Sequence, residues 1–467
     1  MKRTMKMTIA ILALLAILLT CASCAFKKEA QTETGTAAAS EAAAPPKSTV
    51  TADENGSTVI TLNGTTASVS GTGAEADGST VLIQKGGTYT VTGTLTDGRI
   101  IVDADDADVT ILLSGANITC TDSSALYIYK AKTATVYAAE GTENTLTDGK
   151  TYAYNDSFSS QADEEPNACL YSKADLVLAG SGSLTVNSSA AKGITGKDTL
   201  QIETLTLTVN AADNGVTGKD SLTIRDANVT VKAGTDGSSE GAKGLKSDGE
   251  VTVNGGTISL DCTDDGIHAE ENITITDGKL TIRSGDDAIH AENKVTVEGG
   301  TLSLDGHEGL EGTLITMNGG TVSIKATDDG INAAQQISGV TPTVTINDGE
   351  LTIEMGQGDT DGIDANGDIL INGGTIRITA QSPFDFDGKG ELNGGTVYVN
   401  GEQITELGNQ FGGMGGRPGG FGGQNGGFGR PDGGFGRQDG FNGQDGSFPS
   451  DGRNKTPADT SGTGQSV

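Results

Sequence analysis

A short phrase repeated at nearly regular spacing constrains this chain more than any other feature. Its clearest copies run from Asp264 to Glu270 and from Asp286 to Glu292, and each has two acids, a small residue, Ile, His, Ala and Glu. The apolar residue at its centre recurs after 21 or 22 residues, with two longer intervals of 29 and 32. These central residues are Ile194, Val216, Leu245, Ile267, Ile289, Leu310, Ile331, Ile363 and Phe384. A period near 22 with Gly-rich corners is typical of a solenoid in which each repeat forms one turn.

Within each repeat, apolar residues alternate with Thr, Ser and Asn in three short runs. In one repeat the inward-facing residues of these runs are Val251 and Val253, Ile258 and Leu260, and Ile267. This alternation indicates strands with one face in a core. Asn-Gly-Gly at 254–256, 318–320, 372–374 and 393–395 marks one corner, where a sharp bend needs positive φ. The sequence predicts an all-β fold, a right-handed single-stranded parallel β-helix with three sides.

Composition supports a thin core and suggests the domain boundaries. Only 34% of the 467 residues are hydrophobic and none is Trp, which is too little for a large globular core. Segments at 141–166, 234–242 and 336–342 do not fit the period and are expected to project. The predicted parts are a signal peptide (1–24), a disordered tether (25–57), a β cap (58–99), the β-helix (100–405) and a Gly-rich tail (406–467).

The N-terminal residues read as an export signal. A basic start and an apolar run from Ile9 to Leu19 precede Ala22-Ser23-Cys24, which resembles a bacterial lipobox with Cys24 as the acylated residue. We expect an extracellular lipoprotein held to the cell membrane by its lipid alone, with plain secretion as the alternative. The remaining cysteines, 120, 169 and 262, are expected to be buried small side chains rather than a disulfide.

Charge excludes some partners and separates two columns of stacked residues. A net charge of −32 argues against nucleic acid and against an anionic bilayer as partners. One column is predicted to alternate in sign at every step, which favours cross-strand ion pairs and a structural role. Its members are Lys232, Asp261, Arg283, Asp305, Lys325 and Glu354.

A second column carries acids of one sign and is the predicted cation site. Two carboxylates about 5 Å apart repel by roughly 3 kcal/mol at an effective dielectric near 20. The stack must therefore reach water, take up protons or bind cations, and its oxygen-rich chemistry favours calcium over magnesium. The alternative is a solvated acidic edge. The candidate ligands are Asp264, Asp265, Asp286, Asp287, Glu308, Asp328, Asp329, Asp361 and Asp364, with Glu311 and Asn332 beside them.

The residue after each central Ile forms an outward column with other candidate roles. His268 and His290 are neighbours in it and are expected to hydrogen-bond nearby acids, with a transition-metal site as the lesser alternative. Followed towards the N-terminus, the column becomes Lys246, Thr217, Thr195, Tyr171 and Tyr127, with Tyr129 beside the last. Exposed Tyr rings here, with Lys246, are candidate carbohydrate-binding residues. The alternative is that these rings pack beneath the 141–166 insertion.

Three further segments share a pattern: Leu170–Leu176 (LYSKADL), Lys192–Asp198 (KGITGKD) and Asp213–Asp220 (DNGVTGKD). With the lipoprotein start and the Gly-Phe-rich tail, they resemble the repeats and termini of a known family, the clostridial-type carbohydrate-binding β-helix proteins. The resemblance covers about residues 95–405. It implies a β-helix similar to pectate lyases, bound calcium, and binding of cellulose or acidic pectin-like glycans without demonstrated catalysis.

Residues and resemblance together predict a cell-surface lipoprotein that binds plant cell-wall polysaccharide through a calcium-stabilised β-helix. One alternative is a calcium-dependent polysaccharide lyase on the same fold, for which Lys246 is the candidate base. Another is a structural surface protein that binds no glycan.

Overall fold

The computed structural model describes residues 58–408 except 190, 235–238, 240 and 357–359. The predicted signal peptide with Cys24, the tether and nearly all of the tail lie outside the described residues. The described residues form 37 strands and no helix, so they also offer no helical segment long and apolar enough to cross a membrane. The all-β prediction is confirmed.

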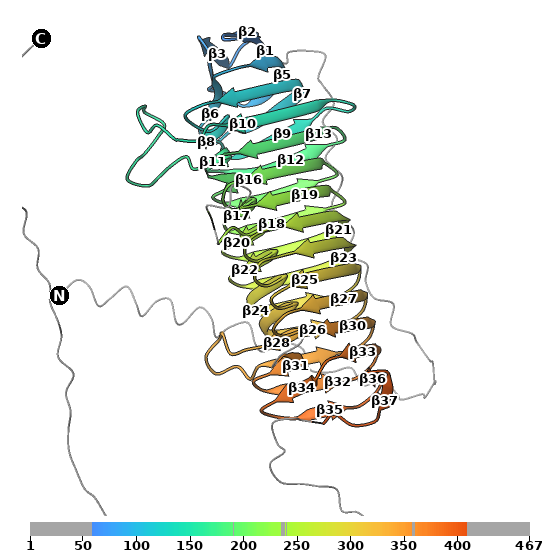
Figure 1. Ribbon diagram of the computed structural model, residues 1–467. Coiled ribbons are helices and arrows are strands. Elements are labelled where there is room, and N and C mark those ends of the chain that lie inside the picture. Colours follow the sequence, from blue (N-terminus) through green and yellow to red (C-terminus); the bar gives the residue numbers. More distant parts are fainter. Residues whose placement is uncertain (1–57, 190, 235–238, 240, 357–359, 409–467) are drawn as a thin grey trace, which may run out of the picture. The chain divides into compact units, whose positions relative to one another are not determined.

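Most strands stand in three columns, in which each strand pairs in parallel with its counterpart one repeat later (Figure 1). Column A contains the central residue of each repeat. It runs through β4 (Thr80–Ile83), β6 (Arg99–Asp103), β8 (Leu126–Lys130), β11 (Ala168–Ser172), β14 (Lys192–Gly196), β17 (Val216–Gly218), β20 (Leu245–Ser247), β22 (Ile267–Ala269), the first parts of β24 (Ile289–Val297) and β26 (Leu310–Met317), β28 (Ile331–Ala333), β31 (Asp361–Ala365) and β34 (Ser382–Phe386).

Columns B and C supply the other two strands of each repeat. Column B runs through β9 (Thr133–Ala138), β12 (Asp175–Gly180), β15 (Thr199–Glu203), β18 (Ser221–Arg225), the first parts of β21 (Glu250–Asp261) and β23 (Asn272–Arg283), the ends of β24 and β26, β29 (Thr343–Ile346), β32 (Asp368–Ile371) and β35 (Gly390–Leu392). Column C runs through β10 (Glu143–Asp148), β13 (Ser183–Ser188), β16 (Thr206–Ala211), β19 (Asn228–Ala233), the ends of β21 and β23, β25 (Thr301–Gly306), β27 (Thr321–Ala326), β30 (Glu350–Met355), β33 (Thr375–Thr379) and β36 (Thr396–Val399).

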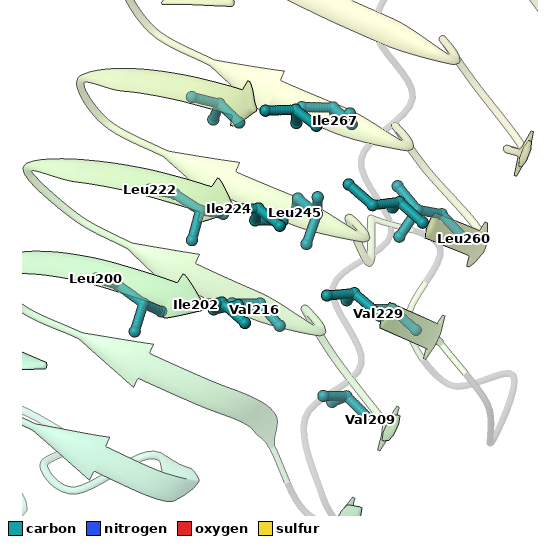
Figure 2. Packing of buried hydrophobic residues seen from close by; sticks show 14 of the residues in the cluster. Leu200, Ile202, Val209, Val216, Leu222, Ile224, Val229, Leu245, Leu260 and Ile267 are labelled. Carbon is teal, nitrogen blue, oxygen red and sulfur yellow. The ribbon is translucent and has the colours of Figure 1, made fainter. Parts of the chain in front are cut away.

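The register of column A matches the spacing in the sequence. Ile194 pairs with Val216, which pairs with Leu245, and the stack continues to Phe384. Because side chains alternate along a strand, these residues and their counterparts in columns B and C point inward. Figure 2 shows this packing, with Leu200 and Leu222 of column B facing the column A residues. Phe384 is 1% exposed, and the other five residues named here are fully buried.

The predicted Asn-Gly-Gly corners adopt the expected backbone. Gly255 and Gly256 have φ of 100° and 91°, a region that side chains with a Cβ rarely adopt. The Asn of each later corner also hydrogen-bonds its neighbour, as in Asn347 Nδ2 to Asn318 Oδ1 at 2.8 Å. The corner sequence therefore provides both the bend and a side-chain ladder that supports it.

Two boundaries differ from the sequence-based prediction. The first insertion begins after residue 148, because Glu143–Asp148 form β10, which pairs in parallel with both β7 (Asp108–Cys120) and β13. Parallel pairing also starts earlier than expected, since β1 (Thr58–Gly64) already pairs with β5 (Gly87–Leu95). Antiparallel strands lie at both ends of the described strands: β2 (Ala67–Ser70) beside β1, β3 (Ala74–Asp77) beside β4, and β37 (Glu402–Ile404) beside β36.

The cysteine prediction is confirmed. Cys120, Cys169 and Cys262 are free and buried. Burial raises the pKa of each thiol, so all three behave as small apolar side chains.

Candidate functional site

Column A presents three outward ranks of side chains, each with one residue per repeat. The central rank follows the buried apolar residue and contains Tyr127, Tyr171, Thr195, Thr217, Lys246, His268, His290, Glu311, Asn332, Asp364 and Asp385. The leading rank lies two residues before the buried one and contains Lys192, Asn214, Lys243, Asp265, Asp287, Glu308, Asp329 and Asp361. The trailing rank contains Lys173, Lys197, Lys219, Asp248, Glu270 and Glu292.

The sign of the charge reverses along all three ranks near the same repeat. Before Lys243 and Lys246 the charged members are all lysines, and after these two residues the ranks contain acids and two histidines. Backbone hydrogen bonds fix the stacking, for example from Gly215 N to Lys243 O and from Gly244 N to Asp265 O, both 2.9 Å. Column A therefore has a basic half and an acidic half on one continuous surface.

Where the basic half meets the acidic half, which we call the boundary, a lysine and a histidine neutralise the acids. Lys243 Nζ lies 2.9 Å from Asp264 Oδ2 and 2.5 Å from Asp265 Oδ2, and His268 Nδ1 lies 2.8 Å from that same Asp265 oxygen. Asp265 is 2% exposed. Although burial alone opposes ionisation, the hydrogen bonds from His268, His290 and Lys243 hold the pKa of Asp265 well below its usual range.

This arrangement gives two of the predicted ligands a lysine partner. The sequence predicts Asp264 and Asp265 in a same-sign stack, and Lys243 occupies the place equivalent to Asp265 one repeat earlier. The sequence carried the signal, because Lys243-Gly244-Leu245 aligns with Asp265-Gly266-Ile267.

Further along, the leading rank has no described lysine partner, and its acids resist ionisation. Burial, followed by the nearby charges of Glu311 and Asp329, raises the pKa of Glu308 to about 8. Burial and the charges of Asp328 and Asp361 raise the pKa of Asp329 to about 6. Asp287 shifts in the same direction because it is buried beside Glu311 and Glu308. Like charges in a desolvated column therefore favour proton uptake or a bound cation.

Several buried oxygens in the described acidic half have no hydrogen-bond partner, among them one of Glu308 and one of Asn332. Glu308 Oε1 accepts a hydrogen bond from Asn332 Nδ2 at 3.0 Å, which leaves Glu308 Oε2 and Asn332 Oδ1 unsatisfied. Glu308 is 9% exposed, so water does not easily solvate its second oxygen. Unsatisfied buried oxygens beside carboxylates are what a hard cation requires of its ligands.

The remaining predicted acids border this cluster. Burial and the charges of Asp329 and Asp385 raise the pKa of Asp364, in the central rank, to about 7. Asp286 and Asp328 lie further out, with His307 Nδ1 3.9 Å from a carboxylate oxygen of each. His307 thus replaces an acid in this outer row and reduces its repulsion when protonated.

His268 and His290, which are neighbours in the central rank and meet edge to face, contact acids as expected. Their ring centroids are 5.0 Å apart, and His290 Nδ1 lies 3.3 Å from Glu311 Oε2 and 3.5 Å from Asp287 Oδ2. Asp265, His268 and His290 also lie close enough together to share an ion. Burial lowers the pKa of His290, but the hydrogen bond to Asp265 and the surrounding acids raise it overall.

The prediction of exposed tyrosines is wrong for two of the three. Tyr127 is fully buried and Tyr171 is 1% exposed. Residues 149–167 place Phe158 against Tyr129, with ring centroids 5.3 Å apart, and Tyr127 contacts both other tyrosines edge-on. The insertion therefore covers these rings, and only Tyr129 is half-exposed. The alternative, in which the rings pack beneath the insertion, matches this arrangement.

Two further predictions concern charged residues. Lys246 is half-buried, with its Nζ 3.7 Å from Asp248 and 3.8 Å from Glu270, so it is paired with acids. The alternating column lies in column C with the predicted register, from Lys232 beside Asp261 to Lys325 beside Glu354. Lys325 and Glu354 form an exposed ion pair at 3.7 Å.

An all-β chain of stacked parallel strands with a charged outward column defines a class of repeat proteins, and sequence comparison gives the family. The family model of the carbohydrate-binding domain-containing proteins matches residues 77–360 and 288–404. The chain belongs to this family.

Two relatives show how far the similarity extends. A carbohydrate-binding domain-containing protein of Acetivibrio thermocellus is 38% identical over 119 residues, which are 25% of this chain and 40% of the relative. The match thus spans less than half of that relative's length. A solved structure, described as the polysaccharide lyase-like protein from C. thermocellum in a gadolinium derivative, is 28% identical and covers 63% of this chain and 100% of its own, with a TM-score of 0.44.

Proposed function

We propose that this protein binds polysaccharide without cleaving it, and that calcium in the acidic half of column A stabilises the fold and bridges to acidic glycans. Membership of the carbohydrate-binding family supports the ligand class. The observation that carries the calcium proposal is the buried Glu308, whose Oε2 has no partner although neighbouring carboxylates surround it. The finer fold proposed is a right-handed, single-stranded, three-sided parallel β-helix, which the pairing of strands one repeat apart supports.

The residues present fit a calcium ion. The unsatisfied oxygens of Glu308 and Asn332 and the carboxylates of Asp287, Glu311 and Asp329 supply oxygen donors, with the rings of His290 and His307 beside them. Asp361 and Asp364 extend this set into the next repeat. Calcium accepts six to eight irregular oxygen ligands, whereas magnesium requires a stricter octahedron. Bound there, calcium would offset the repulsion between acids and leave coordination positions for uronate oxygens.

Binding is tested by pulling the mature protein down on polygalacturonate and on cellulose, with and without a chelator. We expect binding to polygalacturonate, weakened by chelation, and no unsaturated uronate product. Binding to neither polymer would sink the proposal and leave the structural-protein alternative. Metal content of the purified protein, measured by mass spectrometry, tests calcium separately.

The lyase alternative finds little support in the chain's own residues. A lyase base removes a proton from the sugar, so it works as an unpaired neutral amine. Lys246, the predicted base, has carboxylates of Asp248 and Glu270 within 4 Å, so its amine is paired with acids rather than free to face a substrate. Formation of product by the wild type and its loss in Lys246→Ala would reverse this conclusion.

Surface anchoring through Cys24 remains a proposal from the sequence. We expect the protein to sediment with the cell membrane and to be released in a Cys24→Ala variant. Equal sedimentation of both forms would contradict the lipid anchor. A plant cell-wall source for the polysaccharide likewise remains a proposal.

A further inference from the structure

The basic half of column A contains a groove lined by lysines that no role assigned above explains. It has a volume of about 160 Å³, and its lining includes Lys192, Lys197, Lys219 and Lys246. Four ammonium groups around one groove stand out in a chain of net charge −32. Thr195 of β14 and Thr217 of β17 also line it. We call it the lysine groove.

The protein's own structure shows how these lysines hold a carboxylate. Glu165, from the insertion, lies 2.6 Å from Lys173 Nζ and 3.0 Å from Lys197 Nζ, at the N-terminal edge of the lysine groove. Burial opposes ionisation of Glu165, yet hydrogen bonds led by the one from Lys173 lower its pKa to about 2. A pair of lysines from successive repeats is thus a working carboxylate site in this column.

Two further lysines of the groove, Lys192 and Lys219, lack a carboxylate partner such as Glu165. Lys219 follows Lys197 in the trailing rank, and Lys192 lies in the leading rank. Neither forms an ion pair with a carboxylate of the described residues. Lys219 lies near Asp198, whose pKa is raised by burial and by the charges of Asp220 and Asp175, and the Lys219 charge only opposes that rise. Lys246, one repeat further, has only long contacts to Asp248 and Glu270. Two of the four lysines of the groove, Lys192 and Lys219, are therefore without an ion pair among the described residues, whereas Lys197 meets Glu165 and Lys246 lies near Asp248, which also lines the groove.

The lining of the lysine groove offers unsatisfied hydroxyl groups. Thr195 is 4% and Thr217 is 8% exposed, and the Oγ1 of each has no hydrogen-bond partner in the described part of the chain. The two residues pair directly across β14 and β17, so their hydroxyls repeat at the strand spacing of about 4.8 Å. Buried hydroxyls without partners are uncommon in proteins and indicate that a ligand can satisfy them.

We propose that the lysine groove binds carboxylate groups of an acidic polysaccharide directly, without a bridging cation. Lys192 and Lys219 supply the charge, as Lys173 and Lys197 do for Glu165, and the Thr195 and Thr217 hydroxyls contact the sugar. This inference rests on the proposed carbohydrate binding, but it uses a site separate from the acidic half. The protein then has a cation-independent anion site and a calcium site along one column.

The test measures affinity of the mature protein for polygalacturonate in the presence of EDTA. We expect wild-type binding to persist and to weaken about tenfold in Lys192→Gln/Lys219→Gln, because two partly exposed charge contacts with the polymer are lost. The matched control is Lys232→Gln/Lys279→Gln, which removes two exposed lysines of column C and the same total charge. Its affinity should equal that of the wild type. Methyl-esterified polygalacturonate, which has no free carboxylates, should bind both variants and the wild type alike.

Each outcome separates this inference from the proposed function. Wild-type binding that disappears completely in EDTA overturns the lysine groove and leaves calcium bridging in place. Equal weakening in both double variants also overturns it, because only net charge would then matter. Absence of binding to any polymer, with calcium present, removes the proposed function itself. Circular dichroism and melting temperature of the variants show whether any loss reflects misfolding.

Discussion

The two halves of column A have the same backbone and opposite chemistry. In the basic half, Thr195 pairs with Thr217 in a groove lined by lysines, and in the acidic half Asn332 pairs with Asp364 among carboxylates. The buried residues that hold both halves are alike, for example Ile194 and Ile331. The fold therefore requires only the inward residue of each repeat, and the outward ranks are free to carry function.

The halves also differ in how their charges are balanced. Glu165 and the boundary acids meet lysines at 2.5–3.0 Å, whereas Glu308 and Asp329 have mainly other acids for neighbours. A neighbouring cation lowers the pKa of a buried carboxyl group, whereas burial among other carboxylates raises it. A bound cation should therefore stabilise the acidic half more than the basic half.

The largest expected effect is that of calcium on the acidic half. Calcium at about 100 times its dissociation constant should stabilise the folded protein by about 2.7 kcal/mol per site, because a ligand that binds only the folded state shifts the equilibrium. Glu308→Gln/Asp329→Asn should lose most of this increment. Melting temperature with calcium and with EDTA measures both, and an unchanged melting curve in the wild type would favour a solvated acidic edge.

Removing the ion pair between Lys243 and Asp265 at the boundary should lower the free energy of unfolding by slightly less than the loss of calcium does. Lys243→Met removes the ammonium group from buried Asp265, and we expect a loss of about 2 kcal/mol, below the usual value for a broken buried pair because His268 still donates to Asp265. Urea unfolding measures the change, with the exposed Lys232→Met as control. Calcium should restore part of the loss by joining Asp264 and Asp265 to the acidic half. A loss no greater than that of the control would show that the boundary contributes no stability.

The pH dependence should distinguish the two halves without a metal. Folded Glu308, Asp329 and Asp364 have raised pKa values of about 8, 6 and 7, so the folded state binds more protons than the unfolded state between about pH 4 and 8. Stability in EDTA should therefore be highest below this window and fall by about 1 kcal/mol or more as pH rises through it. Glu308→Gln should flatten the profile, measured by denaturation from pH 5 to 8.5. Stability that rises over this range contradicts the raised pKa values.

The smallest effect belongs to column C. Lys325→Gln removes an ion pair whose partners are 64% and 59% exposed, so we expect a change below about 0.5 kcal/mol that disappears in high salt. A larger loss would mean that the alternating charges stabilise the stack as much as the buried pairs of column A do.

Sequence periodicity alone predicted the all-β fold, the inward residues and the register of both charged columns. It could do so because a repeat near 22 residues places equivalent residues beside each other, so spacing along the chain becomes position in space. Ile194 to Phe384, Lys232 to Glu354 and the Asn-Gly-Gly corners all follow from this rule. The longer intervals of 29 and 32 residues showed where residues are inserted into the repeat, but they did not show what the inserted residues contact.

Only the tertiary structure decided which side chains are covered and which charges meet. The insertion at 149–167 lies over Tyr127 and Tyr171 and brings Glu165 to Lys173 and Lys197, a contact that no repeat rule gives. Burial then determines whether an acid such as Glu308 retains its proton. The sequence determined the order of residues along column A, whereas loop packing and solvent exclusion determined which of them remain free to bind a ligand.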